Sequence, residues 1–315
     1  MSDSKGKVAI VGSGLIGSCW ATLFVSAGYS LCLYDVSTAQ LDTAKQNVLK
    51  NLQKLRSEGL SRGTVTSEEA SSRITTTLSL SDALEGAVYA QESTCESLEF
   101  KKKIFAEMDK LVSSDTVLGS STSTIPASKF TENLTHRSQC LVAHPVNPPL
   151  YLTLVEMVPA PWTDDATMAK ACDVMRSIGQ EPVRLHKEVL GFAVNRLQYV
   201  ILAEAWRLVA DDVLSPEDVD KVMSAGLGPR YAIHGPLQTV HLNANGVRDY
   251  FARYGDGIRK VLADMGPTPT FEEAPVLERM EKFLNHSMPL DSLTAMRGER
   301  ERNLAHLASL KKKLD

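Results

Sequence analysis

The sequence lacks the features of a membrane or secreted protein. No apolar run is long enough to cross a bilayer, and the first strand is expected to begin near Lys7, which leaves no room for a signal or transit peptide. The five cysteines form no Cys-x-x-Cys pair and no cluster with histidine, so neither a disulfide framework nor a metal site is expected. Scattered thiols in odd number are typical of a reducing compartment. We therefore expect a cytoplasmic protein.

The chain also lacks a large excess of charge of either sign. The chain carries 34 basic and 38 acidic residues, a net charge of −4, which gives no electrostatic reason to expect nucleic acid or an anionic membrane as a partner. With 315 residues, of which 43% are hydrophobic, the chain is long enough for two globular domains. We expect a small molecule as the ligand.

A glycine-rich segment near the N-terminus is the most informative part of the chain. A buried strand over residues 8–11 is predicted to run into three glycines and an apolar-periodic helix. The first glycine suits a tight turn, the second lets the backbone approach a pyrophosphate, and the third lets helix and strand pack closely. The N–H groups at the helix start attract phosphate. The expected cofactor-binding residues of this segment are Gly12, Gly14, Leu15, Ile16 and Gly17.

The second strand decides the type of cofactor. Residues 30–34 are apolar and end in Asp35, whose carboxylate can accept hydrogen bonds from both ribose hydroxyls of an adenosine. The same charge would repel a 2′-phosphate, and the following residues 36–38 contain no arginine to hold one. A glycine cluster used only for helix packing is the alternative. The order of strand, helix, strand and acid favours NAD.

Strands and helices alternate through the first half of the chain. The short links between them predict a Rossmann-type, doubly wound α/β fold, with a parallel sheet, helices on both faces and the ligand at the carboxyl ends of the strands. Beyond that region the pattern is helical, without a strand. We therefore expect an NAD-binding domain over residues 1–188 and an all-helical substrate and dimerisation domain over residues 189–315. Further strands are expected at residues 74–76, 87–91, 117–119 and 139–144.

A histidine and an acid indicate the chemistry. His144 follows an apolar strand, so it should lie where the nicotinamide of a bound cofactor lies, and its charge changes near neutral pH, as a general base requires. A histidine hydrogen-bonded in a turn is the plainer alternative. Glu156 lies within an apolar run, where an acid needs a partner. A carboxylate facing His144 would orient the ring and stabilise the imidazolium that forms in alcohol oxidation.

Together these motifs resemble the L-3-hydroxyacyl-CoA dehydrogenase family. The resemblance implies that His144 is the catalytic base and that Glu156 is the acid paired with it. It also implies that Ser123 and Asn195 surround the reacting oxygen, as catalytic and substrate-binding residues. Its cofactor-contacting positions correspond to Glu96, Lys101 and Asn147. The matching segments are the glycine loop, residues 120–123, 144–149 and 191–197, and Glu156.

A branch of this family that acts on sugar acids is similar over nearly the whole chain. A sugar-acid enzyme needs a cation for the carboxylate of its substrate, and Arg230, in a glycine-flanked loop, can bind one with two hydrogen bonds. A surface or helix-capping arginine is the alternative. We therefore expect NAD-dependent oxidation of the 3-hydroxyl of a small hydroxy acid, with L-gulonate as the substrate that fits best.

Three other functions stay open. L-carnitine is a 3-hydroxy acid with a quaternary ammonium, but only Tyr231 stands near Arg230 to form an aromatic cage. A short-chain 3-hydroxyacyl-CoA is the third substrate class. A structural protein built on a dehydrogenase scaffold, such as one accumulated in the lens, is the non-enzymatic alternative. The apolar stretch over residues 192–213, together with the resemblance, predicts a homodimer.

Overall fold

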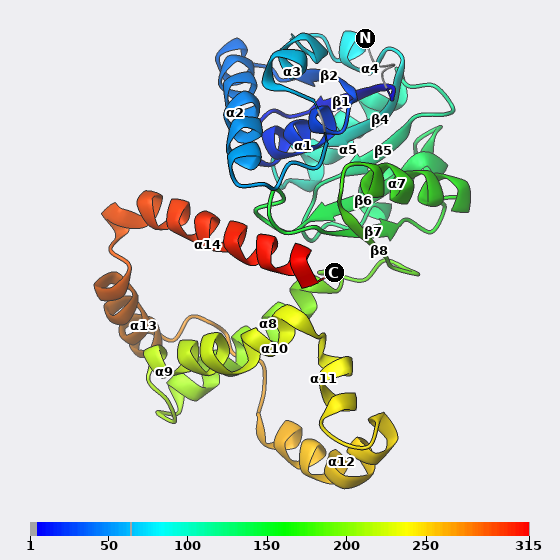
Figure 1. Cartoon of the computed structure of the whole chain (residues 1–315). Helices are drawn as coiled ribbons and strands as arrows, with labels where there is room; N and C mark the ends of the chain where they lie inside the picture. Colours follow the sequence, from blue (N-terminus) through cyan, green and yellow to red (C-terminus); the bar gives the residue numbers. More distant parts are fainter. Residues whose placement is uncertain (1–4, 64, 315) are drawn as a thin grey trace. The chain divides into compact units, whose positions relative to one another are not determined.

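An eight-stranded sheet forms the centre of the N-terminal half in the computed structural model, which describes residues 5–63 and 65–314 (Figure 1). Its strand order is β3-β2-β1-β4-β5-β6-β7-β8. The chain moves outward from β1 to β2 and β3 and then returns past β1 to β4, so β1 and β4 are neighbours at the point where the direction of winding reverses. The strands are β1 (Lys7–Val11), β2 (Ser30–Tyr34), β3 (Ile74–Thr77), β4 (Ala87–Glu92), β5 (Val117–Ser120), β6 (Cys140–Pro145), β7 (Leu154–Pro159) and β8 (Glu181–Arg184).

Two apolar cores cover the two faces of the sheet. Alternate residues of β1 show the division, since Val8 and Ile10 belong to one core and Ala9 and Val11 to the other. Helices α1, α2, α3 and α7 contribute to the first core, and α4, α5 and α6 to the second. This arrangement confirms the doubly wound α/β fold. The helices are α1 (Leu15–Ser26), α2 (Thr38–Ser57), α3 (Ser67–Arg73), α4 (Leu80–Leu84), α5 (Leu98–Asp109), α6 (Ser128–Thr131) and α7 (Asp165–Ser177).

One strand corrects the expectation of an all-parallel sheet. β7 runs antiparallel to β6, whereas every other adjacent pair of described strands is parallel. The connection between β6 and β7 covers only residues 146–153. A parallel crossover needs a dozen or more residues, so a connection of this length can only return the chain in the opposite direction.

The second part of the chain is helical throughout its described elements. Ser215 caps α9, where its Oγ accepts the N–H of Asp218 at 3.1 Å and Pro216 occupies the first turn. No helix among the described residues is long and apolar enough to cross a membrane. The helices are α8 (Val194–Ala210), α9 (Pro216–Lys221), a π-helix (Val222–Leu227), α10 (Gly228–Ile233), α11 (Pro236–Leu242), α12 (Val247–Asp264), α13 (Ala274–Ser287) and α14 (Leu293–Leu314).

The chain divides into two units, and the boundary differs from the expected one at 188. The first unit takes in the chain up to Asn195 and the residues from Glu301 onward, and the second is Arg196–Arg300. The second half of α14 therefore belongs with the sheet rather than with the other helices. Ala305 is 4% exposed within the first core, and Lys54 of α2 forms an ion pair with Glu301 at 3.0 Å. A short amphipathic stretch near the C-terminus does not reveal which core it completes.

Candidate active site

The glycine loop lies where β1 and β4 end side by side. The N–H of Ser93, just after β4, donates to the carbonyl of Val11 at 2.8 Å. Gly12 has a φ of +96°, and a Cβ there would come within 2.8 Å of the Ser93 carbonyl. A Cβ on Gly17 would come within 2.0 Å of the Gly12 carbonyl. Both glycines are therefore required by the close approach of backbone to backbone.

A cavity of about 490 Å³ opens in front of this loop. Gly14 caps α1, and an added Cβ there would meet no atom within 4 Å, so its backbone faces open space. Leu15 and Ile16 form the first turn of α1, whose N–H groups have no partner within the helix. This combination fits a pyrophosphate. The cavity is lined by Gly12, Gly14, Tyr34, Asp35, Val36, Gln40, Ser93, Thr94, Cys95, Phe100 and Ile104.

Asp35 lines this cavity and is held by the loop itself. Its Oδ2 accepts the backbone N–H of Ser13 at 3.0 Å and the Ser13 hydroxyl at 2.9 Å. Its Oδ1 accepts the N–H of Ser37 at 3.3 Å. The side chain is partly exposed, so the carboxylate keeps acceptor capacity for a ribose. The residues present thus fit the adenosine half of NAD.

His144 and Glu156 form the pair expected from the sequence. They lie directly opposite each other in the antiparallel register of β6 and β7, and His144 Nδ1 lies 2.8 Å from Glu156 Oε2. Both residues are buried, at 7% and 1% exposure. The imidazole packs against the ring of Phe192, with centroids 5.7 Å apart. Because Nδ1 faces Glu156, Nε2 is the ring nitrogen left for a substrate.

The second oxygen of Glu156 is fixed by the start of α8. Its Oε1 accepts the N–H of Ala193 at 2.7 Å and that of Val194 at 3.0 Å. Burial raises the pKa of this carboxyl, but the hydrogen bonds from His144, Val194 and Ala193 outweigh burial and bring the pKa of Glu156 below its ordinary value. Glu156 is therefore an ionised carboxylate, ready to stabilise a positive charge on His144.

Five consecutive hydroxyl residues, 120–124, begin at the last residue of β5, and hydrogen bonds from other parts of the chain hold them. Ser120 Oγ donates to Glu92 Oε2 at 2.5 Å. Ser121 Oγ accepts from Gln91 at 2.7 Å and from the indole of Trp20 at 3.0 Å. Thr122 Oγ1 and the N–H of Ser123 both donate to Glu96 Oε1, at 2.6 and 3.0 Å. We refer to residues 120–124 as the hydroxyl loop.

Asn195 joins the hydroxyl loop to α8. It is 8% exposed, and its Nδ2 donates to the carbonyl of Ser123 at 2.8 Å. The side chain of Ser123 is exposed. The structure thus brings together Ser123 and Asn195, the two residues expected around the reacting oxygen.

The three remaining residues expected to contact the cofactor have different surroundings. One carboxylate oxygen of Glu96 accepts hydrogen bonds from the hydroxyl loop. Lys101 is only 1% exposed, and its Nζ lies 2.9 Å from Glu92 and 3.8 Å from Glu96. Asn147 is exposed in the connection after β6. Lys101 therefore acts within the protein interior rather than as a free surface cation.

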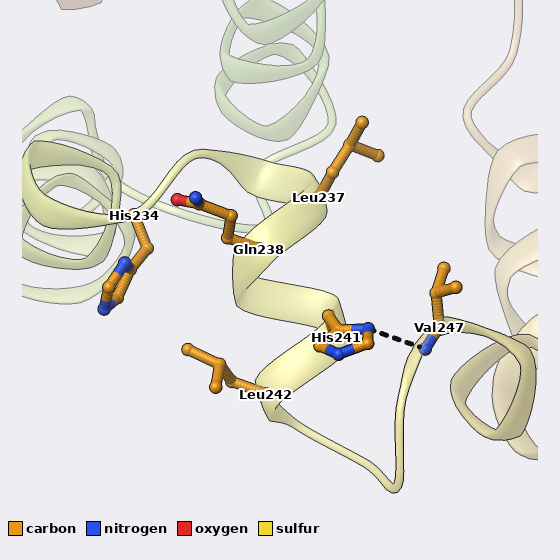
Figure 2. A pocket seen from close by; sticks show the side chains of 6 residues that line it. All are labelled: His234, Leu237, Gln238, His241, Leu242 and Val247. Carbon is orange, nitrogen blue, oxygen red and sulfur yellow. Dashed lines mark hydrogen bonds between the residues drawn. The ribbon is translucent and has the colours of Figure 1, made fainter.

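Arg230 lies in the second unit. It is exposed in α10, directly after the π-helix over Val222–Leu227, an irregularity that often accompanies functional sites. Nearby in the chain, a largely apolar pocket of about 540 Å³ is lined by residues of α11 and its flanks, and Arg230 is not among them (Figure 2). His241 Nδ1 accepts the N–H of Val247 at 3.1 Å in this pocket, so its proton is on Nε2 (Figure 2).

Two family models match the chain one after the other. The NAD-binding domain of 3-hydroxyacyl-CoA dehydrogenase matches residues 7–189, and the C-terminal domain matches residues 191–284. This chain belongs to the 3-hydroxyacyl-CoA dehydrogenase family. The family resemblance of the motifs is thus confirmed, NAD is the cofactor, and the protein is an NAD-dependent oxidoreductase.

Relatives of several kinds share this family. Lambda-crystallin of Oryctolagus cuniculus is 46% identical over 315 residues, which cover 99% of this chain and 98% of that protein. L-carnitine dehydrogenase of Staphylococcus epidermidis is 33% identical over 257 residues, 81% of this chain and 78% of that enzyme. Among solved structures, an NAD⁺-dependent 5-formyl-3-hydroxy-2-methylpyridine 4-carboxylic acid 5-dehydrogenase has a TM-score of 0.82 at 27% identity, covering 96% of this chain and 97% of its own.

Sequence reasoning missed three residues that support the hydroxyl loop. Glu92 is completely buried, and Gln91 and Trp20 donate hydrogen bonds to Ser121. The signal for Glu92 was an acid at the end of an apolar strand, which is the same signal that singled out Glu156. Trp20 fits an apolar helix face, and its spacing does not reveal that its indole N–H donates to Ser121, at the end of β5.

Proposed function

We propose that the protein oxidises the 3-hydroxyl group of a small hydroxy acid, with L-gulonate as the substrate. The observation that carries the proposal is the buried His144–Glu156 pair, with 2.8 Å between Nδ1 and Oε2, at the carboxyl end of β6 in an NAD-binding unit. NAD, when bound, supplies the hydride acceptor. His144 Nε2 takes the hydroxyl proton, and Glu156 stabilises the imidazolium that results.

Ser123 and Asn195 have the task of orienting the hydroxyl that loses its proton. Their contact through the Ser123 carbonyl, at 2.8 Å, supports a common role. The glycine loop and Asp35 bind the cofactor, together with Glu96, Lys101 and Asn147. Arg230 binds the substrate carboxylate through two parallel hydrogen bonds from its guanidinium group.

The choice of L-gulonate rests on the substrate's carboxylate and hydroxyls and on the sugar-acid branch that the motifs resemble. Likeness to a lambda-crystallin over nearly the full length of both chains agrees with that branch, whereas the match to L-carnitine dehydrogenase covers 81% of this chain. L-Carnitine remains the second candidate because that relative is also 33% identical. A short-chain 3-hydroxyacyl-CoA is the third, and a structural role can coexist with any of them.

A substrate comparison tests the proposal. Purified protein is assayed for NADH formation with L-gulonate, L-carnitine and 3-hydroxybutyryl-CoA at equal concentration, and kcat/KM is measured for each. The highest kcat/KM with L-gulonate supports the assignment. A higher kcat/KM with either other substrate overturns it, and no NADH formation with any of them favours the structural alternative.

We include a homodimer and a cytoplasmic location in the proposal. Several large apolar side chains of α8 are exposed, among them Leu197 at 64% and Val200 at 62%, which an isolated chain would leave in water. All five cysteines are free thiols, which fits a reducing compartment. Light scattering at micromolar concentration tests the dimer, since a mass near the single-chain value of 34.4 kDa overturns it.

A further inference from the structure

A buried ion pair contacts the hydroxyl loop, and one of its two partners, Glu92, has no role in the chemistry described above. Glu92 is the last residue of β4 and is 0% exposed, and Lys101, on α5, is 1% exposed. Lys101 Nζ lies 2.9 Å from Glu92 Oε2 and 3.1 Å from Oε1. Burying two charges costs several kcal/mol in desolvation, and well-packed apolar residues often give equal or greater stability. The pair therefore needs an explanation other than stability.

The alternation of side chains along the strands places this pair beside the active site. Side chains two residues apart in a strand point to the same face of the sheet. Glu92 therefore points to the same face as Ala90, and His144 to the same face as Val142. Ala90 and Val142 both lie in the second core. Ser120 at the end of β5 has the same parity as Leu118, another member of that core. Because β4, β5 and β6 are successive neighbours in the sheet, their carboxyl ends present these polar side chains on one face.

Glu92 reaches the hydroxyl loop directly. Its Oε2 accepts the hydroxyl of Ser120 at 2.5 Å, and Ser120 Oγ in turn accepts the N–H of Thr122 at 3.3 Å. Its Oε1 accepts the N–H of Thr94 at 2.7 Å, which fixes the segment after β4. One carboxylate thus joins the ends of β4 and β5.

Glu92 also acts on the loop indirectly, because Lys101 interacts with both Glu92 and Glu96 and Glu96 accepts hydrogen bonds from the loop. Lys101 Nζ lies 3.8 Å from Glu96 Oε2. The other oxygen of Glu96 accepts from Thr122, from the N–H of Ser123 at 3.0 Å and from the N–H of Thr124 at 3.3 Å. The Glu96 side chain is 43% exposed, and burial alone therefore does not fix it. Its attraction to the buried ammonium of Lys101 limits its movement.

We infer that the Glu92–Lys101 pair fixes the hydroxyl loop, and that Glu92 is a positioning residue for Ser123. The role for turnover rests on the proposed function, in which Ser123 orients the reacting hydroxyl. A displacement of about 1 Å at such a group can cost roughly 100-fold in rate. Glu92 touches neither substrate nor cofactor, and it acts only through Ser120 and through Lys101 and Glu96.

The test compares Glu92→Gln with a matched control, Asp109→Asn. Asp109 is also a buried carboxylate of the second-core face and lies on the same helix as Lys101, about 12 Å further along. It accepts the N–H groups of Thr135 and His136, at 2.9 and 2.8 Å, away from the hydroxyl loop. Both variants remove one buried charge without changing side-chain size. Ser120→Ala removes the direct contact to Glu92 and the hydrogen bond from the N–H of Thr122, and leaves the Glu92–Lys101 pair in place, so it serves if Glu92→Gln does not fold.

Amide hydrogen exchange of the peptide covering residues 121–125 is the first readout, since the N–H groups of Ser123 and Thr124 are donors within it. We expect exchange there to become about tenfold faster in Glu92→Gln and to stay unchanged in Asp109→Asn. Turnover of the best substrate is expected to fall about tenfold in Glu92→Gln, while the KM for NAD changes less than about twofold.

Unchanged exchange in Glu92→Gln, or an equal rise in Asp109→Asn, overturns the inference. Faster exchange with unchanged turnover overturns the role of Ser123 in the proposed function instead, because the loop would then be fixed by Glu92 without affecting the reaction. The exchange measurement needs no substrate, so the two failures are distinguishable.

Discussion

Ser13 holds Asp35 with two hydrogen bonds to the same oxygen. The backbone N–H donates to Oδ2 at 3.0 Å and the hydroxyl at 2.9 Å, so the position of Asp35 is tied to that of the glycine loop. The other oxygen, Oδ1, has only the N–H of Ser37 at 3.3 Å. In the proposed function, cofactor choice depends on a carboxylate whose position is set by the loop that would receive the pyrophosphate.

We predict that Asp35→Ala raises the KM for NAD about tenfold or more and reduces the preference for NAD over NADP. The reason is the loss of a ribose partner and of the repulsion toward a 2′-phosphate. Steady-state kinetics with both cofactors measures this change. Asp35→Asn is the control, since it removes the charge at nearly constant shape. Equal use of NAD and NADP by the unmutated protein would contradict the assignment.

His144→Asn should reduce turnover by about 100-fold or more, which is the typical contribution of a general base. NADH binding, measured by fluorescence titration, should stay nearly unchanged, because the ring acts on a proton and not on the dinucleotide. Glu156→Gln should affect the same step with a smaller loss. Retention of more than about a tenth of the turnover in His144→Asn would exclude the general-base role.

Glu156 should also contribute to the pH dependence of stability. Its pKa in the folded protein lies below the ordinary value of 4.5, so its ionised form stabilises the fold above that value. The contribution is lost as pH falls through the lowered pKa. Urea unfolding of wild type and Glu156→Gln should therefore differ most near pH 7 and progressively less below about pH 4.5. A constant difference across that range would contradict the lowered pKa.

Cys95 should be the cysteine that reports cofactor binding. It is exposed and lines the cavity with Gly12 and Asp35, whereas the other four cysteines are buried. Burial raises the pKa of Cys19 to about 12 and raises that of Cys140 as well. We predict that one thiol of the folded protein reacts with iodoacetamide, that NAD slows this reaction, and that Cys95→Ser abolishes it. Reaction of a second thiol, or no protection by NAD, would contradict the prediction.

The sequence predicted the glycine loop, Asp35, His144 and Glu156 because each stands in a local pattern with a physical reason. A strand followed by glycines, or an acid inside an apolar run, is visible without knowing the fold. The pairing of His144 with Glu156 was predicted from chemistry, and the register of β6 and β7 supplies its geometric cause.

Other features depend on contacts between distant residues and leave little local signal. The edge strand β8 carries Pro182 and three exposed residues, so no alternation marks it as a strand. The antiparallel direction of β7 follows from the short connection between β6 and β7. It can be predicted only when both strands and the length of that connection are considered together. The support of the hydroxyl loop by Glu92 joins residues 28 positions apart, and only the order of strands in the sheet places them together.

The return of the C-terminal segment to the first unit has a consequence for biosynthesis. Ala305 completes a core whose other members are almost all made before residue 180, with the whole helical unit translated in between. The growing chain therefore emerges with a nucleotide-binding unit that still exposes apolar surface where α14 will pack. That surface is covered only after α14 has been synthesised and has left the ribosome, so the N-terminal unit cannot reach its full stability before then.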